Sequence, residues 1–466
     1  MSPSPGPYED GPRAAHDDEP PGSPGRRRTL RLAAWAAVLA VWLSAWAVAL
    51  GARRDAAPVT ASVPAAAPVL PAGGDLEAQV GALQVQLRAQ PKDHAAWATL
   101  GVAYVEQART DGDPSRYPQA QRALARSLEL APGNDPALAG RAALAAARHD
   151  FSGALRLADA ALARNPYNER ALCSRVDALV ELGRYDEAER AAGTADSRRP
   201  GVPVFTRYAY VHELRGDVRT ARRVLERALG TAAAPGDVAY VATALGRLAA
   251  REGDGRTALR YYARALAADD AYLPALEGRA RAQAANGDRA AAIRGMERVV
   301  ERAPLPAALV ALGELYEARG GGGDRARARE QYALVDAWAA LARANGVDAD
   351  LDTALAEADH GDRKAALRAA RAEWSRRHTV HTADALAWAL HVNGRDAEAL
   401  PYARRATATG YRDAAFHYHR GVIERATGHE AEARRLLSSA LRLDPGFSPA
   451  GASAAEKALR ALGGAA

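Results

Sequence analysis

Prolines recur in this chain at Pro132, Pro166 and Pro200, each 34 residues after the one before. Each closes a stretch of helix-favouring residues such as WATLGVAYVEQA or YDEAERAAGTADSRRP. A repeat of this length is one helical hairpin, which is too small to bury its own apolar face and must stack on its neighbours. The period therefore predicts an all-α solenoid that presents a binding surface and carries no catalytic site.

Bulk composition narrows the class of protein without choosing the fold. With 466 residues, 48% of them hydrophobic and 25% charged, the chain is long enough for one long repeat array or for two or three ordinary domains. Cys173 is the single cysteine, which excludes an intramolecular disulfide framework, and we expect it to be a buried small residue. The net charge is +6, but 62 Lys and Arg are interspersed with 56 Asp and Glu, so we expect no nucleic-acid partner.

The N-terminal 74 residues predict where the protein lies relative to the membrane. Residues 1–28 are rich in Pro, Gly, Ser, Asp and Arg and predict a disordered cytoplasmic tail. Residues 29–51 predict a transmembrane signal-anchor helix, because the stretch from Leu32 to Gly51 carries no charge and a helix of that length crosses a hydrocarbon core of about 30 Å. Four arginines precede this span within residues 26–31 and two follow it at 53 and 54, a bias that places the rest of the chain outside the cytoplasm.

An exported protein with a cleaved signal is the alternative. The run RRRTLR resembles a twin-arginine export signal, and Ala47–Ala49 has the small residues of a cleavage site. Either outcome exports the repeats. Residues 52–74, rich in Pro and Ala, predict a semi-extended linker between the membrane and the array.

Small residues recur where paired helices would cross. The second helix of every expected hairpin has an alanine at the same position, namely Ala120, Ala154, Ala188, Ala221, Ala258, Ala292, Ala328, Ala366, Ala399 and Ala433. The facing position on the first helix is also small, at Gly101, Ala142, Ala209, Gly246, Ala280, Gly313, Ala354, Ala387 and Gly421, with Val176 as the exception. Helices approach to 8–10 Å only where the side chains at the crossing are short. Replacing Ala188 or Ala399 with Leu should therefore destabilise the protein by about 1–3 kcal/mol.

The turns between the paired helices have their own signal. Glycines stand at the expected ends of first helices, at Gly183, Gly216, Gly253, Gly287, Gly361, Gly394 and Gly428, where a left-handed residue ends a helix without a Cβ clash. Aspartates follow four of them, at Asp217, Asp254, Asp288 and Asp362, and predict caps for the next helix.

From Asp75 onward, about four fifths of the chain resembles the tetratricopeptide repeat family. In the best unit Trp97, Leu100, Gly101 and Tyr104 line the first helix, and Tyr117, Ala120, Leu124, Ser127 and Pro132 follow on the second. The resemblance implies about ten hairpins over residues 75–446, with an N-terminal half-repeat, and a C-terminal capping helix over 447–466. The pattern departs from the family at an inserted loop near Gly112 and in the glycine run 320–323, after which a longer helix through Trp338 predicts a bend.

The family's first helices line a concave groove that holds a peptide or a partner helix, and the register assigns two patches to that face. The first patch contains Thr206, Tyr210, Tyr240, Thr243, Arg247, Arg251, Glu277 and Arg281. Its aromatic and guanidinium groups suit an acidic or aromatic-containing ligand. The plainer alternative is that these are ordinary solvated residues of a helix face.

The second patch places His381, Asp384, Trp388 and His391 on one helical face, with Tyr418 and Arg425 on the next hairpin. Imidazoles beside a carboxylate can bind zinc or titrate near neutral pH. However, His381 and His391 are nearly three helical turns of about 5.4 Å apart, too far to share one ion. We therefore expect no metal and no other cofactor.

These observations predict a bacterial, membrane-anchored scaffold whose extracytoplasmic solenoid binds a protein or peptide partner. An accessory factor for cofactor or metalloprotein maturation is the alternative, because LRAQPKDHAAWATLGVAYVEQ resembles repeat subunits of cytochrome c biogenesis machinery. A third class is a regulatory repeat protein at the inner leaflet, which requires inverted topology. Tail, span, linker, hairpins and cap account for every residue, so we expect neither an enzyme nor a small-molecule substrate. The sequence does not identify the partner.

Overall fold

A computed structural model describes residues 76–111, 114–344 and 350–463. Across these ranges the regular structure is helical, with 22 α-helices and one short 3-10 turn, η1 (Pro114–Arg116). The expected tail 1–28, transmembrane helix 29–51 and linker 52–74 lie outside the described residues, so they remain predictions. None of the described helices has the length and hydrophobicity to cross a bilayer.

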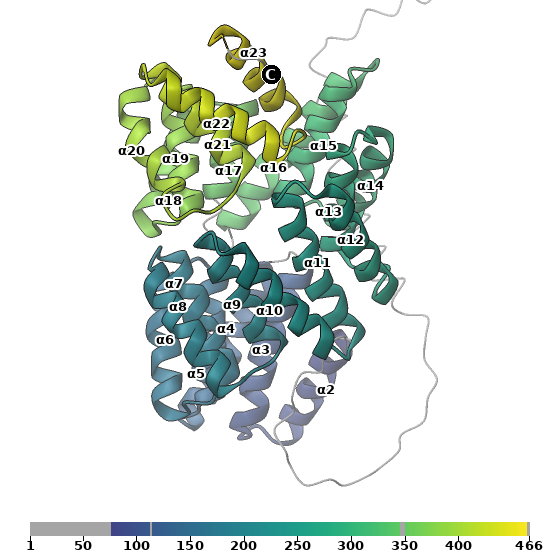
Figure 1. Ribbon diagram of the computed structural model, residues 1–466. Coiled ribbons are helices and arrows are strands. Elements are labelled where there is room, and N and C mark those ends of the chain that lie inside the picture. Colours follow the sequence, from purple (N-terminus) through teal and green to yellow (C-terminus); the bar gives the residue numbers. More distant parts are fainter. Residues whose placement is uncertain (1–75, 112–113, 345–349, 464–466) are drawn as a thin grey trace, which may run out of the picture. The chain divides into compact units, whose positions relative to one another are not determined.

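The described helices form ten hairpins between two single helices (Figure 1). The first helices of the hairpins are α3 (His94–Asp111), α5 (Asp135–Ala147), α7 (Glu169–Glu181), α9 (Val202–Leu214), α11 (Pro235–Arg251), α13 (Leu273–Ala285), α15 (Pro306–Arg319), α17 (Asp350–His360), α19 (Val380–Val392) and α21 (Ala414–Ala426). The second helices are α4 (Tyr117–Leu130), α6 (Phe151–Arg164), α8 (Tyr185–Arg198), α10 (Val218–Thr231), α12 (Gly255–Ala268), α14 (Arg289–Arg302), α16 (Asp324–Ala344), α18 (Arg363–Arg376), α20 (Asp396–Ala406) and α22 (Glu430–Leu443). The single helices α2 (Leu76–Ala89) and α23 (Pro449–Ala461) pack at the two ends. Because each first helix also contacts the first helix of the next hairpin, the hairpins stack as an all-α repeat solenoid, as the period predicts.

The small residues lie where the paired helices touch. All ten second-helix alanines are completely buried, which confirms the expected crossing points. Where the facing residue is glycine, a large side chain one turn further along the second helix fills the space. A Cβ on Gly101 would lie 2.5 Å from Leu124, and one on Gly246 would lie 2.6 Å from the Tyr262 ring. Gly313 and Gly421 face Tyr332 and Leu437 in the same way. At each of these crossings a glycine on one helix makes room for a large side chain on the other.

Local caps end and begin the helices as the sequence predicts. The carboxylates of Asp217, Asp254 and Asp288 each accept a hydrogen bond of 3.0 Å from a backbone N–H of the helix that follows. Six of the seven expected turn glycines have positive φ, and Gly361 is the exception. His149 takes the corresponding left-handed position between α5 and α6 with φ of 62°. The turn geometry is therefore encoded within each hairpin.

Turns of the early hairpins contact loops of the late hairpins. The α7–α8 turn meets the α18–α19 loop, where Arg377 donates to Glu181 at 2.7 Å and the backbone N–H of Val380 donates to the Tyr185 hydroxyl at 2.8 Å. The α9–α10 turn meets the α20–α21 loop, because a Cβ on Gly216 would lie 2.8 Å from the carbonyl oxygen of Gly410. The α11–α12 turn meets the end of α22, since a Cβ on Gly253 would lie 2.7 Å from the carbonyl oxygen of Leu443. Successive hairpins thus return to pack on those that began the array.

The seventh hairpin departs from the repeat as its sequence suggests. Its second helix, α16, has 21 residues. Trp338 and Ala342, in the last part of this helix, belong to the hydrophobic cluster that α2, α3, α4 and α5 build. The extension therefore contacts the first hairpins as well as its own neighbours.

Candidate functional site

First helices from the middle of the array and two late loops enclose a groove of about 560 Å³. Its lining comes from α11, α13 and α15 on one side and from the α20–α21 and α22–α23 loops on the other. Arg247, Arg251 and Arg281 of the first predicted patch line it. Asp413, Asp444 and Phe447 line it from the late loops. The return of the late hairpins therefore gives one face of the solenoid a groove with walls on two sides.

Ion pairs also join first helices outside the groove lining. Glu106 of α3 pairs with Arg170 of α7 at 3.0 Å, and Asp177 of α7 pairs with Arg207 of α9 at 2.9 Å. Each pair joins different hairpins, so it fixes the stacking of the array. These carboxylates and guanidinium groups are consequently engaged with each other.

Two of the three groove arginines are engaged in the same way. Arg251 pairs with Glu213 of α9 at 2.5 Å and lies over the Tyr411 ring at 5.3 Å. Burial works against the charged form of Arg251, but the attraction of Glu213 outweighs it and holds the pKa above its usual range. Arg281 pairs with Glu277 at 2.9 Å and donates to the carbonyl oxygen of Ala307 at 2.9 Å.

Arg247 differs from these two arginines. It is exposed and makes no hydrogen bond or ion pair with any described residue. It lies within electrostatic range of Tyr262, whose pKa burial raises to about 12, and of Tyr272, which is also within range of Tyr240. The groove therefore offers a free guanidinium group beside phenol side chains, an arrangement that suits a carboxylate or an aromatic side chain of a ligand.

Glu277 of the first patch also lines the groove, and the other residues of this patch lie outside the lining. Tyr240 is 42% exposed and extends the surface next to Arg247, whereas Tyr210 is half-buried. Thr206 and Thr243 are buried, and their hydroxyls donate to backbone carbonyls of their own helices. Threonine hydroxyls of this kind are satisfied within the helix, so they are not available to a ligand.

The second patch is interior in its centre, and here the expectation of an open groove face needs correction. Asp384 is 2% exposed and bonds to the His419 ring at 2.9 Å. Trp388, also buried, stacks on His419 with ring centroids 4.2 Å apart and donates to Asp359 at 2.7 Å. Tyr418 is buried beside the same tryptophan. The helix of the next hairpin covers these side chains, so they hold hairpins together.

The other members of this patch separate from one another. His381 contacts the rings of Tyr411 and Phe416, and burial lowers its pKa to about 4. His391 bonds to Asp396 at 2.5 Å at the opposite end of the helix. Arg425 is exposed on α21. The structure therefore does not bring the second patch together as one binding surface.

Sequence reasoning missed the residues that the late loops contribute. Asp413 has a sequence signal as a helix cap and accepts from the backbone N–H of Ala415 at 2.9 Å, but nothing local places it across from Arg251. His419, the partner of Asp384, directly follows Tyr418, the residue that the repeat register assigned to the patch. Both contacts depend on how the hairpins return.

No group of three or more His, Cys, Asp or Glu in the described part of the chain is arranged to hold a metal ion. Cys173 is 5% exposed, and burial raises the pKa of its thiol to about 11, which agrees with the expected structural role.

Repeated hairpins, stacked first helices and an inner groove define this chain as an all-α repeat solenoid with a groove on one face. The family model of the tetratricopeptide repeat matches residues 145–209, which span α6 to α9. This segment therefore matches the tetratricopeptide repeat family, in agreement with the resemblance of the sequence.

Solved structures of similar proteins match parts of the array. One is a thermophilic tetratricopeptide repeat protein of Thermus thermophilus, with 23% identity, a TM-score of 0.36 and coverage of 40% of this chain and 98% of that one. Another is PilW, described as a widely conserved type IV pilus biogenesis factor, with 22% identity, a TM-score of 0.37 and coverage of 44% and 92%. PilF of Pseudomonas aeruginosa has 22% identity, a TM-score of 0.34 and coverage of 45% and 92%. No curated protein matches the chain significantly.

Proposed function

We propose that this protein is a scaffold that binds a segment of a protein partner in the groove around Arg247. Arg247 carries the proposal, because it is the groove arginine that no carboxylate of the described chain neutralises. An acidic side chain of a bound segment would supply the missing partner, and Tyr240 and Tyr272 would contact its neighbours. The enclosed volume of about 560 Å³ accommodates a few residues of such a segment.

We further propose that the scaffold is bacterial, anchored in the membrane by residues 29–51 and facing the extracytoplasmic side. The uncharged stretch and the arginine bias around it support this orientation. A reporter that is active only in the cytoplasm, fused after Ala466, should stay inactive. Activity of that reporter would contradict the orientation and leave the groove proposal standing.

Fluorescent peptides of equal length test the groove. Acidic peptides that contain Phe or Tyr should bind the purified full-length chain, as measured by fluorescence anisotropy, and basic peptides of the same length should not. Arg247→Glu should weaken the binding of acidic peptides at least tenfold, because it places a like charge in the groove. Arg264→Glu, an equal charge change at an exposed position of α12 outside the groove lining, is the control and should have no effect.

Equal loss in both variants would show unspecific attraction to the protein's charge and would contradict the proposal. Absence of binding by every peptide would contradict it as well. Trp388→Ala is unsuitable for this test, because Trp388 is buried between histidines and its loss disturbs packing.

A further inference from the structure

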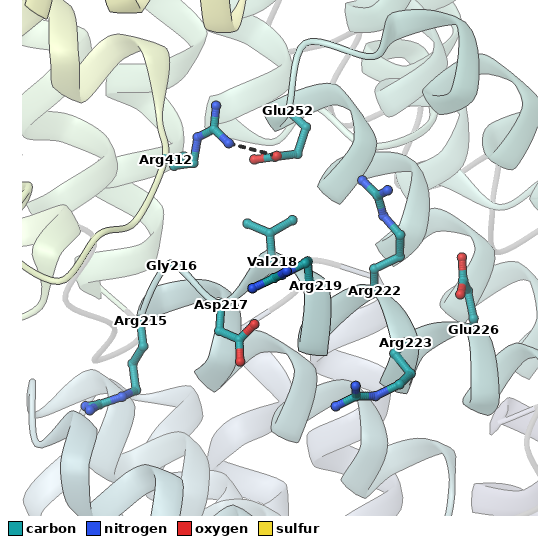
Figure 2. A pocket seen from close by; sticks show the side chains of 10 residues that line it. All are labelled: Arg215, Gly216, Asp217, Val218, Arg219, Arg222, Arg223, Glu226, Glu252 and Arg412. Atoms are coloured by element: carbon teal, nitrogen blue, oxygen red, sulfur yellow. Dashed lines mark hydrogen bonds and ion pairs between the residues drawn. The ribbon is translucent and has the colours of Figure 1, made fainter.

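A second cavity, of about 620 Å³, lies where the start of α10 meets the α20–α21 loop (Figure 2). Its lining is dominated by arginines and includes Arg215, Arg219, Arg222, Arg223 and Arg412, with Glu252 beside them. None of its lining residues lines the inner groove. The cavity is therefore a distinct place on the molecule.

The cavity has an excess of positive charge. Five arginines face three carboxylates, those of Asp217, Glu226 and Glu252, which leaves a net charge of +2. Two of the carboxylates are already engaged, since Asp217 accepts from the backbone N–H of Thr220 at 3.0 Å and Glu252 accepts from Arg412 at 2.9 Å. Arg412 is therefore paired with a carboxylate of the lining, whereas Arg219, Arg222 and Arg223 make no ion pair with any described residue.

Arg219 and Arg222 have no partner of their own among the described residues. Neither makes a hydrogen bond or an ion pair there, and both are exposed to the cavity. Figure 2 shows Arg222 extending from α10 toward the side where Glu252 and Arg412 meet, and Arg219 lying beside Val218. Arg215 differs, because it pairs with Asp186 at 2.5 Å and with Glu189 at 3.0 Å.

We propose that this cavity binds a phosphoryl anion between Arg219, Arg222 and Arg412. Guanidinium groups offer planar pairs of N–H donors that match the oxygens of a phosphoryl group, and several of them around one cavity favour an anion with more than one negative charge. A singly charged carboxylate would leave part of this charge without a counterion. The same chemistry is present in a free polyphosphate and in the phosphomonoester headgroup of an anionic phospholipid such as phosphatidic acid.

Binding at this place would join two segments that are far apart in the sequence. Arg219 and Arg222 belong to α10, whereas Arg412 belongs to the α20–α21 loop, which already contacts the α9–α10 turn through Gly216 and Gly410. An anion held by both segments stabilises the conformation in which they touch, by a free energy that grows with the logarithm of its concentration above its dissociation constant. The ligand would therefore also resist separation of the early and late hairpins.

Calorimetric titration of the purified full-length chain with sodium pyrophosphate tests the proposal. We expect saturable binding with one site per chain. The double variant Arg219→Ala/Arg222→Ala should bind at least tenfold more weakly. The matched control Arg260→Ala/Arg264→Ala removes the same charge from α12 outside the cavity and should bind like the wild type.

Titration with glycerol 3-phosphate, the headgroup of phosphatidic acid without its acyl chains, separates the two sources of the anion. Tighter binding of pyrophosphate supports a free polyphosphate, and tighter binding of glycerol 3-phosphate supports a lipid headgroup. Absence of saturable binding by both compounds would overturn the proposal, as would equal loss in the control variant.

Protection of arginines from phenylglyoxal gives a second readout that needs no variant. Pyrophosphate should slow the modification of Arg219, Arg222 and Arg412 at least threefold, as measured by mass spectrometry, and should leave Arg264 unchanged. Equal rates at these arginines with and without pyrophosphate would contradict the proposed site.

Discussion

Turn glycines of the early and late hairpins share a backbone conformation and differ in what lies against them. Gly183 and Gly216 have φ of 71° and 79°, and Gly394 and Gly428 have 73° and 85°. A Cβ on either early glycine would collide with the backbone of a late loop, at His378 or Gly410. A Cβ on either late glycine would meet no atom within 4 Å. The glycine therefore forms the turn in both the early and the late hairpins, but only in the early hairpins does it also allow a tertiary contact.

Arginines near these turns show the same contrast. Arg377 is 7% exposed and joins Glu181 of an early hairpin, whereas Arg395 pairs with Glu398 of its own turn and remains half-exposed. The return of the late hairpins, and not the hairpin itself, therefore gives some repeated positions a second structural role. Four predictions test this contrast.

The largest effect is expected at Arg377. Arg377→Ala leaves Glu181 without its partner, weakens the neutralisation of the buried Glu373 and removes a cation that lies 5.3 Å from the Phe151 ring. Breaking a buried ion pair on one side costs about 3–5 kcal/mol. Arg395→Ala, at an exposed pair, should cost less than about 1 kcal/mol. Hydrogen exchange of residues 377–392, followed by mass spectrometry, should show much faster exchange only in Arg377→Ala.

The two kinds of turn glycine should differ next. Gly183→Ala should destabilise its turn by about 3 kcal/mol, of which about 1 kcal/mol comes from the left-handed conformation and the rest from the collision with His378. Gly428→Ala should cost only about 1 kcal/mol, since its surroundings are open. Thermal unfolding midpoints of the two variants measure the difference. Equal midpoints would mean that the early turns and late loops do not touch in solution.

Acid should weaken the contact between the early turns and the late loops. His381 is surrounded by Asp413, Arg251, Arg377 and the rings of Tyr411 and Phe416, and burial lowers its pKa from 6.5 to about 4. Below pH 6.5 the unfolded chain binds a proton at His381, whereas the folded chain does not bind it until the pH approaches 4. The free energy of unfolding therefore falls as the pH drops from 6.5 toward 4. At pH 4.5 the loss is on the order of 2 kcal/mol, since each pKa unit corresponds to about 1.4 kcal/mol. His381→Asn should have a smaller difference in thermal unfolding midpoint between pH 7 and pH 4.5, and an unchanged difference would exclude His381 as a cause.

The smallest effect is expected at Arg412. Its pair with Glu252 joins an early turn to a late loop, but the arginine side chain is 47% exposed. Arg412→Ala should therefore cost less than about 1 kcal/mol, as for other solvent-exposed pairs. Thermal unfolding in the absence of phosphate measures this. A loss of stability as large as that of Arg377→Ala would show that solvent exposure does not explain the difference between the Arg412–Glu252 and Arg377–Glu181 pairs.

Several parts of the candidate site could be predicted because their signal is local. Arg247, Arg251 and Arg281 follow from the register of the first helices, and the structure places all three in the groove. Asp384 and Trp388 occupy a comparable register, yet the next hairpin buries them. The register states which face of a helix a residue occupies, but it does not state how closely the following hairpin covers that face.

The all-α hairpins, their turns and their crossing points can be predicted from the sequence alone. Those features arise from contacts within a single repeat, such as Gly101 against Leu124, and are written in its 34 residues. Which turn meets which loop depends on the packing of the whole array, for example Glu181 with Arg377, 196 residues later. That pairing depends on a small rotation added at every repeat. Because the rotation accumulates over the whole array, no single repeat encodes where the chain returns.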